Sequence, residues 1–331
     1  MEKTIALDSL LFAARATLVL LVAFILGVFY SFLLRKVYAR LQARRGPWLI
    51  VPKEARETLG LSRILQPLYD VLKLLYKESL IPETANKRLF KSAPYIALGS
   101  IALSVLFVPI AGSSPLGSFK FSLIIVLYLL LIPPLLLVIG GYSSSSPWGA
   151  IGAGREIELT LIYEVVQAFA VFSVAVYARS LSLSEIIEFQ RSHTPFIVLN
   201  PLAAIAFLFA IVGKLRVKPF DIPDASVEIV AGPETEYSGK LLGILELGRI
   251  FSIFVYTALY LDLFIGGGVA FFPPFLFVVG GSVVVFALAL INAINPRYRL
   301  DQAFVWYLKY QVPVGIMAIA WTYLIRFAVP L

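Results

Sequence analysis

The chain has 331 residues, of which 60% are hydrophobic and 15% are charged, and its formal net charge is +8. This composition excludes an ordinary soluble domain, in which apolar residues make up about half of the chain and charged residues about a quarter. With no cysteine and one histidine, disulfides, iron–sulfur ligation and the usual metal or haem sites are not expected on this chain. We therefore expect an all-α integral membrane protein forming a single membrane domain over residues 1–331.

The sequence contains about eight apolar stretches that are long enough to cross a bilayer, which takes about 20 residues in a helix. They lack the alternating pattern of barrel strands, and the first run is too long for the core of a signal peptide, so we interpret it as a retained helix. The predicted spans are residues 12–34, 92–111, 119–141, 158–178, 194–213, 240–264, 270–291 and 304–328.

The positive charges are distributed unevenly among the loops between these spans. Loops after the first, third, fifth and seventh spans hold roughly twenty Lys or Arg residues, against about five on the other side, which is the positive-inside pattern. This places both termini outside a prokaryotic plasma membrane. The net charge is then explained by topology and by anionic head groups, so no nucleic-acid partner is expected.

Residues 35–91 form the first inner loop and carry about thirteen of those cations. Within it, the stretch LSRILQPLYDVLKLLYKESLIP (61–82) gathers its apolar residues on one helical stripe and most of its charges off it. This pattern predicts an amphipathic helix along the inner interface, covered by lipid or by a neighbouring subunit. A solvated loop that only sets the topology is the alternative for the basic segment.

The stretch GYSSSSPWGAIGAGREIELTLIYEV (141–165) leads from a Gly/Ser/Pro loop into the fourth span. Glu156 and Glu158 fit a first turn that is favoured by the helix dipole. Glu164 lies about two turns deeper, where an unpaired carboxylate costs several kcal/mol. We interpret Glu164 as an internal relay position.

The stretch KPFDIPDASVEIVAGPETEYSG (218–239) is the acidic part of a loop spanning residues 214–239. Its prolines predict broken, partly helical backbone, which is tolerated at membrane depth only where protein or a wet cavity surrounds it. Apolar residues between the acids would pack one face while the carboxylates line the other. A solvent-exposed acidic loop remains the alternative.

Two further groups of charges accompany the last three spans. Glu246 and Arg249 are three residues apart and able to pair within a helix. The stretch NPRYRLDQ (295–302) carries Arg297, Arg299 and Asp301. These three residues either form a local ion network that fixes the loop or dock a partner.

Several of these stretches together resemble a known family, the eight-helix membrane subunit of respiratory complex I that forms the membrane side of the quinone chamber. The resemblance rests on RKVYARLQARRGPW (35–48), LQPLYDVLKLLYKESLIP (65–82), PFDIPDASVEIVAGPETEYSG (219–239) and PRYRLDQ (296–302). It covers nearly the whole chain. It implies that the acids of the loop belong to a funnel linking the docked redox module to the membrane interior.

From the residues and this resemblance we expect two sets of functional side chains. The expected ion or proton relay comprises Glu158, Glu164, Asp221, Asp224, Glu228, Glu236 and Glu246. The expected docking surface for a peripheral module comprises Arg44, Arg45, Arg155, Arg297, Arg299 and Asp301. No catalytic residue, cofactor or metal is expected on this chain.

The sequence departs from the quinone-type pattern of the family at several positions. These are Lys214, Val217, Ser226, Leu159, Ile162 and Arg249. The departures make the chain more similar to the homologous subunit of membrane-bound nickel–iron hydrogenases and of ferredoxin-linked sulfane reductases. That resemblance implies a non-redox subunit of an oxidoreductase complex, which anchors an electron-transfer module and couples it to H⁺ or Na⁺ movement.

The partners implied are a hydrogenase-like large subunit, iron–sulfur subunits that hold the clusters and the catalytic centre, and further membrane subunits, including antiporter-like ones. Two alternatives stay open: a quinone-binding subunit of a complex I-type oxidoreductase, and a free-standing ion transporter or channel. The absence of cysteine and the scarcity of methionine and histidine also suit a thermophile.

Overall fold

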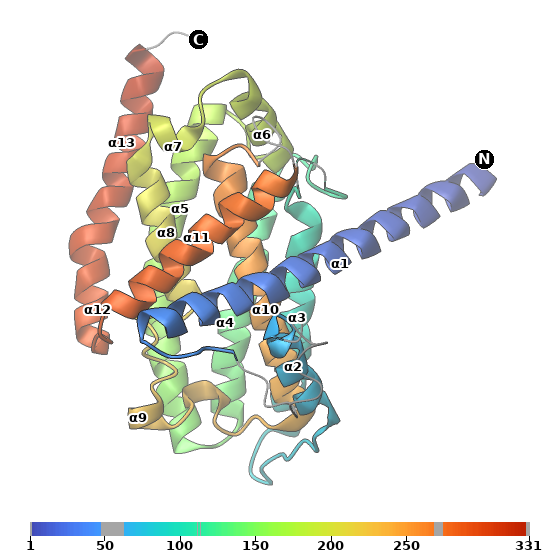
Figure 1. The fold of residues 1–331 in the computed structure, drawn as a ribbon, viewed down its shortest axis with the longest axis vertical. Helices are drawn as coiled ribbons and strands as arrows, with labels where there is room; N and C mark the ends of the chain where they lie inside the picture. Colours follow the sequence, from blue (N-terminus) through green and yellow to red (C-terminus); the bar gives the residue numbers. More distant parts are fainter. Residues whose placement is uncertain (1, 48–62, 111, 113, 268–273, 329–331) are drawn as a thin grey trace.

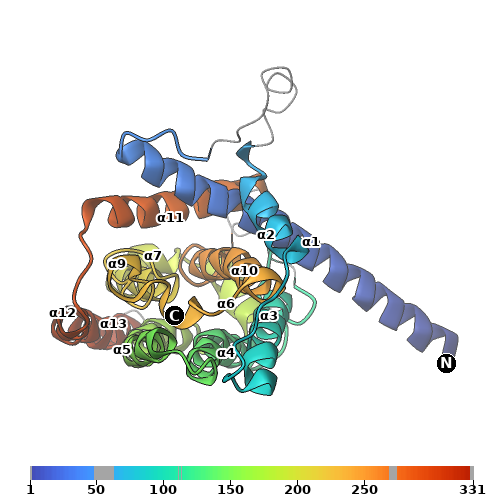
Figure 2. The same ribbon diagram turned by 90° about the horizontal axis from the view of Figure 1, so that it is seen from below.

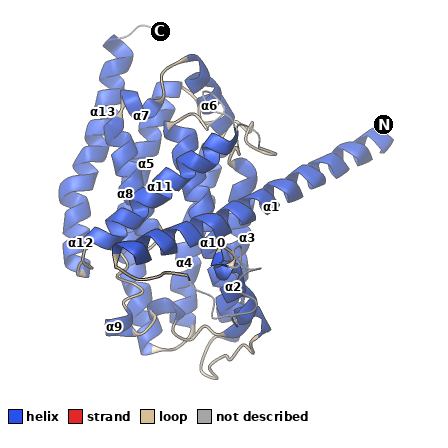
Figure 3. Ribbon diagram, in the orientation of Figure 1, coloured by secondary structure: helices blue, strands red, loops and turns tan. Residues whose placement is uncertain are grey.

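The computed structural model describes residues 2–47, 63–110, 112, 114–267 and 274–328. Every regular element in these ranges is helical (Figure 3). The elements are α1 (Glu2–Leu41), α2 (Gln66–Tyr76), α3 (Lys87–Phe107), α4 (Ser122–Ser143), α5 (Pro147–Ala178), α6 (Leu183–Ser192), α7 (Phe196–Leu199), α8 (Pro201–Lys214), α9 (Ser226–Ile229), η3 (Gly232–Glu234), α10 (Gly239–Phe264), α11 (Pro274–Ile294), α12 (Leu300–Trp306), η4 (Tyr307–Gln311) and α13 (Val312–Ala328). The expected all-α membrane class is confirmed.

Seven helices of the described chain are long and apolar enough to cross a membrane, the last being α12, η4 and α13 in continuous sequence. The predicted span over residues 194–213 differs from the other seven. Asn200 and Pro201 divide it into α7 and α8, because proline favours the first turn of a helix and the Asn200 side chain accepts the Ala203 N–H. The remaining helix, α8, has 14 residues and a length of about 21 Å.

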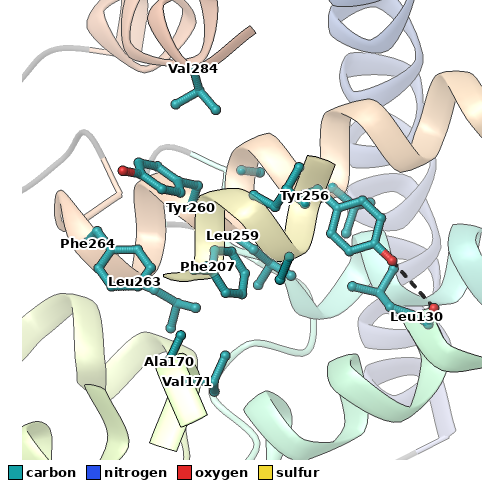
Figure 4. Packing of buried hydrophobic residues seen from close by; sticks show 14 of the residues in the cluster. Leu130, Ala170, Val171, Phe207, Tyr256, Leu259, Tyr260, Leu263, Phe264 and Val284 are labelled. Atoms are coloured by element: carbon teal, nitrogen blue, oxygen red, sulfur yellow. Dashed lines mark hydrogen bonds between the residues drawn. The ribbon is translucent and has the colours of Figure 1, made fainter. Parts of the chain in front are cut away.

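The core lies where α5, α8 and α10 meet. Figure 4 shows Phe207 of α8 between Phe264 of α10 and the α5 residues Ala170 and Val171. The Phe207 and Phe264 rings lie 5.6 Å apart, within the range of favourable aromatic pairs. Buried residues occur along α10 from Gly239 to Phe264, so the helix is packed at both ends.

Helix α1 crosses the bundle obliquely, and its N-terminal half projects beyond the other helices (Figures 1 and 2). Apolar side chains on that half are exposed, among them Leu10, Leu18 and Leu21. In a membrane these residues would face lipid or a neighbouring subunit. The C-terminal half packs against α10 and α11.

The predicted amphipathic helix over residues 61–82 is present as α2, although residues 61 and 62 lie outside the described ranges. Its apolar face is partly covered within the chain, because Val71 packs in a small cluster with Val28 and Ile250, whereas Leu72 is 39% exposed. On the other face, Arg35 and Asp70 form an exposed ion pair of 2.7 Å between α1 and α2. The helix thus joins α1 to α10.

Candidate ion-relay site

The acidic loop lies between α8 and α10, at the end of the bundle opposite α6 (Figure 1). Two close backbone approaches fix its position. Gly232 has a φ of +55°, and a Cβ on Gly152 of α5 would lie only 2.5 Å from the Gly232 Cα. Gly239 has a φ of +52° and lies against the Glu78 carbonyl. Only glycine tolerates this combination of left-handed backbone and contact.

A guanidinium group forms the centre of the site. Arg216, just after α8, lies 3.1 Å from Glu156, 2.9 Å from Asp224 and 3.3 Å from Glu234. These carboxylates come from α5, the acidic loop and η3. The fixed fork of an arginine can hold several carboxylates at once, which a lysine could not do with the same geometry.

A second guanidinium extends the network to α10. Arg249 lies 2.6 Å from Glu234, 2.8 Å from Glu246 and 3.5 Å from Asp224. Asp224 and Glu234 are therefore shared by both arginines. Four carboxylates face two guanidinium groups, so the network has two negative charges in excess when every group is ionised. Buried charges in excess recruit protons or cations.

The electrostatics of the loop residues follow from this arrangement. Burial raises the pKa of Glu234; Arg249 and Arg216 oppose the rise, and Asp224 adds to it. Burial disfavours the charge of Arg216, yet Asp224, Glu156 and Glu234 together raise its pKa well above the ordinary value. Arg216 therefore stays charged, and Glu234 is the loop carboxyl whose burial favours the protonated form.

Lys214, the last residue of α8, forms a separate ion pair deeper in the bundle. Its ammonium lies 2.6 Å from the Glu164 carboxylate, and its side chain is 1% exposed. The same ammonium lies 5.8 Å from the ring of Tyr163 and 5.5 Å from that of Tyr256, within the range of cation–π attraction. Glu164 is thus paired, as an intramembrane carboxylate must be.

Two further pairs connect the loop to its surroundings. Arg297, before α12, contacts Asp221 at 2.5 Å, and hydrogen bonding to Asp221 raises the pKa of Arg297. Arg155 of α5 contacts the half-exposed Glu228 at 2.6 Å. Each pair joins an expected docking residue to an expected relay residue.

A cavity of about 280 Å³ adjoins Lys214 and the network around Arg216 and Arg249. Glu156, Lys214, Arg216, Glu234 and Arg249 line its polar end. Apolar side chains of α1, α3, α4 and α10 line the rest, among them Leu34, Ala97, Leu130, Leu137 and Ile253. The site therefore combines titratable groups with a space that can hold water or a small amphipathic molecule.

The remaining predicted residues lie around this centre. Glu158 is exposed on α5, and Glu236 is partly buried beside Tyr237. Arg44 and Arg45 are exposed just after α1. Arg299 and Asp301 are 3.7 Å apart and 77% and 74% exposed. Arg297 contacts Asp221 and does not belong to this local pair. The structure brings Glu164, Asp221, Asp224, Glu228 and Glu246 to one end of the bundle.

Several of the central groups were not predicted from the sequence. Glu234 was not assigned to the relay, Glu156 was interpreted as a helix-dipole residue, and Arg216 was not assigned to either set. Lys214 was noted only as a departure from a family pattern, and Arg249 was noted as a departure and as a partner of Glu246. The available signal was Arg216 with Lys214 at the end of an apolar helix, because cations at that depth need partners.

No group of three or more His, Cys, Asp or Glu side chains in the part of the chain that the structure describes is arranged to hold a metal ion. The ligand chemistry available at the site is instead that of paired carboxylates, guanidinium groups and tyrosine hydroxyls. Of these groups, the carboxylates can bind and release protons, and the guanidinium groups hold them in place.

Several known proteins are similar to this chain. Residues 14–323 match the family described as NADH dehydrogenase. The H-type membrane subunit of NADH-quinone oxidoreductase from Syntrophotalea carbinolica is 34% identical over 301 residues, covering 86% of this chain and 87% of that protein. Its counterpart from Dehalococcoides mccartyi is 29% identical over 303 residues, covering 90% of this chain and 83% of that protein.

A solved structure is also similar, that of the membrane-bound sulfane sulfur reductase, an archaeal respiratory membrane complex. The similarity has a TM-score of 0.83 at 28% identity and covers 94% of this chain and 99% of the other. The matched proteins thus come from oxidoreductase complexes. The chain belongs to the NADH dehydrogenase family of membrane subunits, which includes the H-type subunit of NADH-quinone oxidoreductase.

Proposed function

We propose that this chain is the non-redox membrane subunit that anchors a peripheral electron-transfer module and couples its turnover to the movement of H⁺ or Na⁺. One observation carries the proposal: four carboxylates share two arginines at one end of the bundle, beside a cavity. Because the carboxylates share the same two arginines, a charge arriving nearby would change the proton occupancy of the network.

The proposed partners follow from the family. Members of this family function within multi-subunit respiratory complexes, and the solved relative comes from a sulfane sulfur reductase. We assign the redox centres, including iron–sulfur clusters and a nickel–iron or other catalytic metal, to a hydrogenase-like large subunit and its iron–sulfur partners. Antiporter-like membrane subunits would carry the ions, and exposed Arg44 and Arg45 would contribute to docking.

A specific contact supports a complex that does not reduce a membrane quinone. The Lys214–Glu164 pair lies at the polar end of the cavity, and the Lys214 ammonium faces two tyrosine rings. A desolvated ion pair leaves few free donors for a quinone carbonyl. Quinone retained in stoichiometric amounts by the purified complex would favour the second candidate, a quinone-binding subunit like the NADH-quinone oxidoreductase relatives.

The coupling role can be tested with Asp224→Asn, because Asp224 contacts both arginines. In sealed vesicles containing the assembled complex, we expect electron transfer to continue and ion uptake per electron to fall. Glu188→Gln is the control, since Glu188 is exposed on α6 at the other end of the bundle and belongs to neither expected set. Full ion uptake in Asp224→Asn would show that the network is structural. Purification of the chain as an isolated oligomer would favour a free-standing transporter.

A further inference from the structure

A second carboxyl site lies at the other end of α10. Asp262 is 0% exposed and lies 13 residues beyond Arg249, which corresponds to about 20 Å along the helix. It therefore lies in the half of the bundle near α6, away from the Arg216–Arg249 network (Figure 1). Under the predicted orientation this is the outer half of the membrane.

The Asp262 carboxyl lacks hydrogen-bond partners. Neither of its oxygens has a partner within the described residues, although both are buried. The nearby amide of Gln190 donates to the backbone carbonyls of Asp262 and Leu263, at 3.0 and 3.3 Å, and not to the carboxyl. Gln190 therefore ties α6 to the end of α10 without neutralising Asp262.

The walls of this site are apolar and close. Gly267 has a φ of +67°, and a Cβ there would lie 2.9 Å from Asp262 Oδ1 and 3.1 Å from Ile187 of α6. The carboxyl is thus enclosed between α6 and the turn that follows α10. Its enclosure leaves no room for a larger residue at Gly267.

No cation among the described residues compensates the group. The charged and titratable side chains on α6 and directly after it are Glu185, Glu188, Arg191 and His193, and none of them forms an ion pair with Asp262. The ion pairs found in the described ranges all lie elsewhere. An ionised carboxylate in this position would cost several kcal/mol.

We propose that Asp262 is a proton-binding site. Its carboxyl is protonated and exchanges this proton with the aqueous phase beyond α6. A neutral carboxylic acid removes the cost of a lone buried charge, and its O–H can donate to a backbone carbonyl of the same helix turn. α6 packs against this end of α10, and it carries the exposed Glu185 and Glu188. This inference concerns proton binding by this chain and stands independently of the coupling role.

Infrared spectroscopy of the assembled complex tests the assignment. The spectrum of the wild type minus that of Asp262→Asn should contain one carboxylic acid C=O band, and this band should shift down after exchange into D₂O. Asp262→Asn should assemble normally, because asparagine replaces a neutral acid of similar size. Asp301→Asn, at an exposed carboxylate, should remove only carboxylate bands.

If Asp262→Asn fails to assemble, the same band can be sought without any substitution, by labelling aspartate with ¹³C in the wild type. Loss of carboxylate bands in Asp262→Asn would show that the group is ionised and would overturn the proposal. A C=O band that stays unshifted in D₂O would refute the exchange. Sodium-dependent stabilisation of the wild type that Asp262→Asn abolishes would identify a cation site instead.

Discussion

At the scale of single residues, the buried ion pairs decide how the site is held. Lys214 and Glu164 neutralise each other where neither could remain alone, since the Lys214 side chain is 1% exposed and the Glu164 side chain 21% exposed. Removing one partner of such a pair is far more costly than replacing both. The pair is therefore a test of whether these charges are structural or available for relay.

We expect Lys214→Met to destabilise the protein by about 3 to 5 kcal/mol, because it leaves the Glu164 carboxylate without compensation. The double variant Lys214→Met with Glu164→Gln should recover most of the loss. The measurement is the midpoint of thermal unfolding of the complex in mild detergent, obtained from the folded fraction at each temperature. Arg299→Gln, in the exposed pair with Asp301, should shift the midpoint very little. Equal losses in the single and double variants would contradict this prediction.

Glu234 gives a prediction for pH. Burial raises its pKa in the folded protein above the ordinary value of 4.5, so the folded state binds the proton more tightly than the unfolded state. The contribution to stability is then fully present below the ordinary pKa and is lost as pH rises through the raised pKa. Glu234→Gln should flatten this decline, even though it weakens the contacts with Arg249 and Arg216. An unchanged slope of unfolding midpoint against pH would rule out Glu234 as its source.

How far the sequence predicts the site depends on the separation of its residues. The Glu246–Arg249 pair was predicted because both lie on one turn of a helix, and it is confirmed at 2.8 Å. The contacts of Arg216 join residues 156, 224 and 234, which belong to three segments. Local periodicity carries no information on such distant pairing, and the central arginine was missed.

At the scale of elements, the acidic loop depends on glycines where backbones touch. A Cβ on Gly152 would lie 2.5 Å from Gly232 and 2.6 Å from Pro233, so α5 and η3 pack without room for a methyl group. Gly154, two residues further along α5, has only the Tyr142 hydroxyl within 3.6 Å of such a Cβ. Gly152 is therefore a test position for this packing, and Gly154 is its matched control.

We expect Gly152→Ala to displace η3, and Glu234 with it, and to lower the yield of assembled complex. Gly154→Ala should assemble like the wild type, because helix propensity favours alanine and no backbone obstructs it. Size-exclusion profiles of the two variants provide the measurement. Normal assembly and normal stability of Gly152→Ala would mean that the loop adapts to the added methyl group.

The predicted and observed elements agree best where a long apolar run decides the outcome. Seven predicted spans correspond to long helices. The span over residues 194–213 was predicted too long, since hydropathy continues across Asn200 and Pro201 although the backbone direction changes there. Hydropathy predicts which stretch lies in the membrane. A break in a helix depends on a few residues, and hydropathy does not predict it.

At the scale of the whole molecule, the two ends of the bundle differ in charge chemistry. The end with α9 has the ion network and the exposed Arg44 and Arg45, whereas the end with α6 has a single buried carboxyl among the described residues, Asp262. Both termini lie toward the α6 end (Figure 1). This asymmetry suits a protein that receives a peripheral module on one side only.

Docking to the α9 end can be tested by charge reversal. Arg44→Glu combined with Arg45→Glu should release the peripheral subunits from membranes at moderate salt, because like charges would then face an acidic partner surface. Arg191→Glu, an exposed reversal on α6 at the other end, should leave them bound. Peripheral subunits that stay fully membrane-bound in the double variant would remove these two arginines from the docking surface.

The shortness of α8 has an electrical consequence. Its length of about 21 Å is well below the hydrocarbon thickness of about 30 Å, and the ion network begins where α8 ends, at Lys214 and Arg216. If water reaches the ion network at the end of α8, the membrane voltage falls over a shorter distance there. A full crossing is worth about 2.3 kcal/mol per elementary charge at 100 mV, so a charge that moves within this shorter distance takes a larger share of that energy per ångström than it would in intact bilayer.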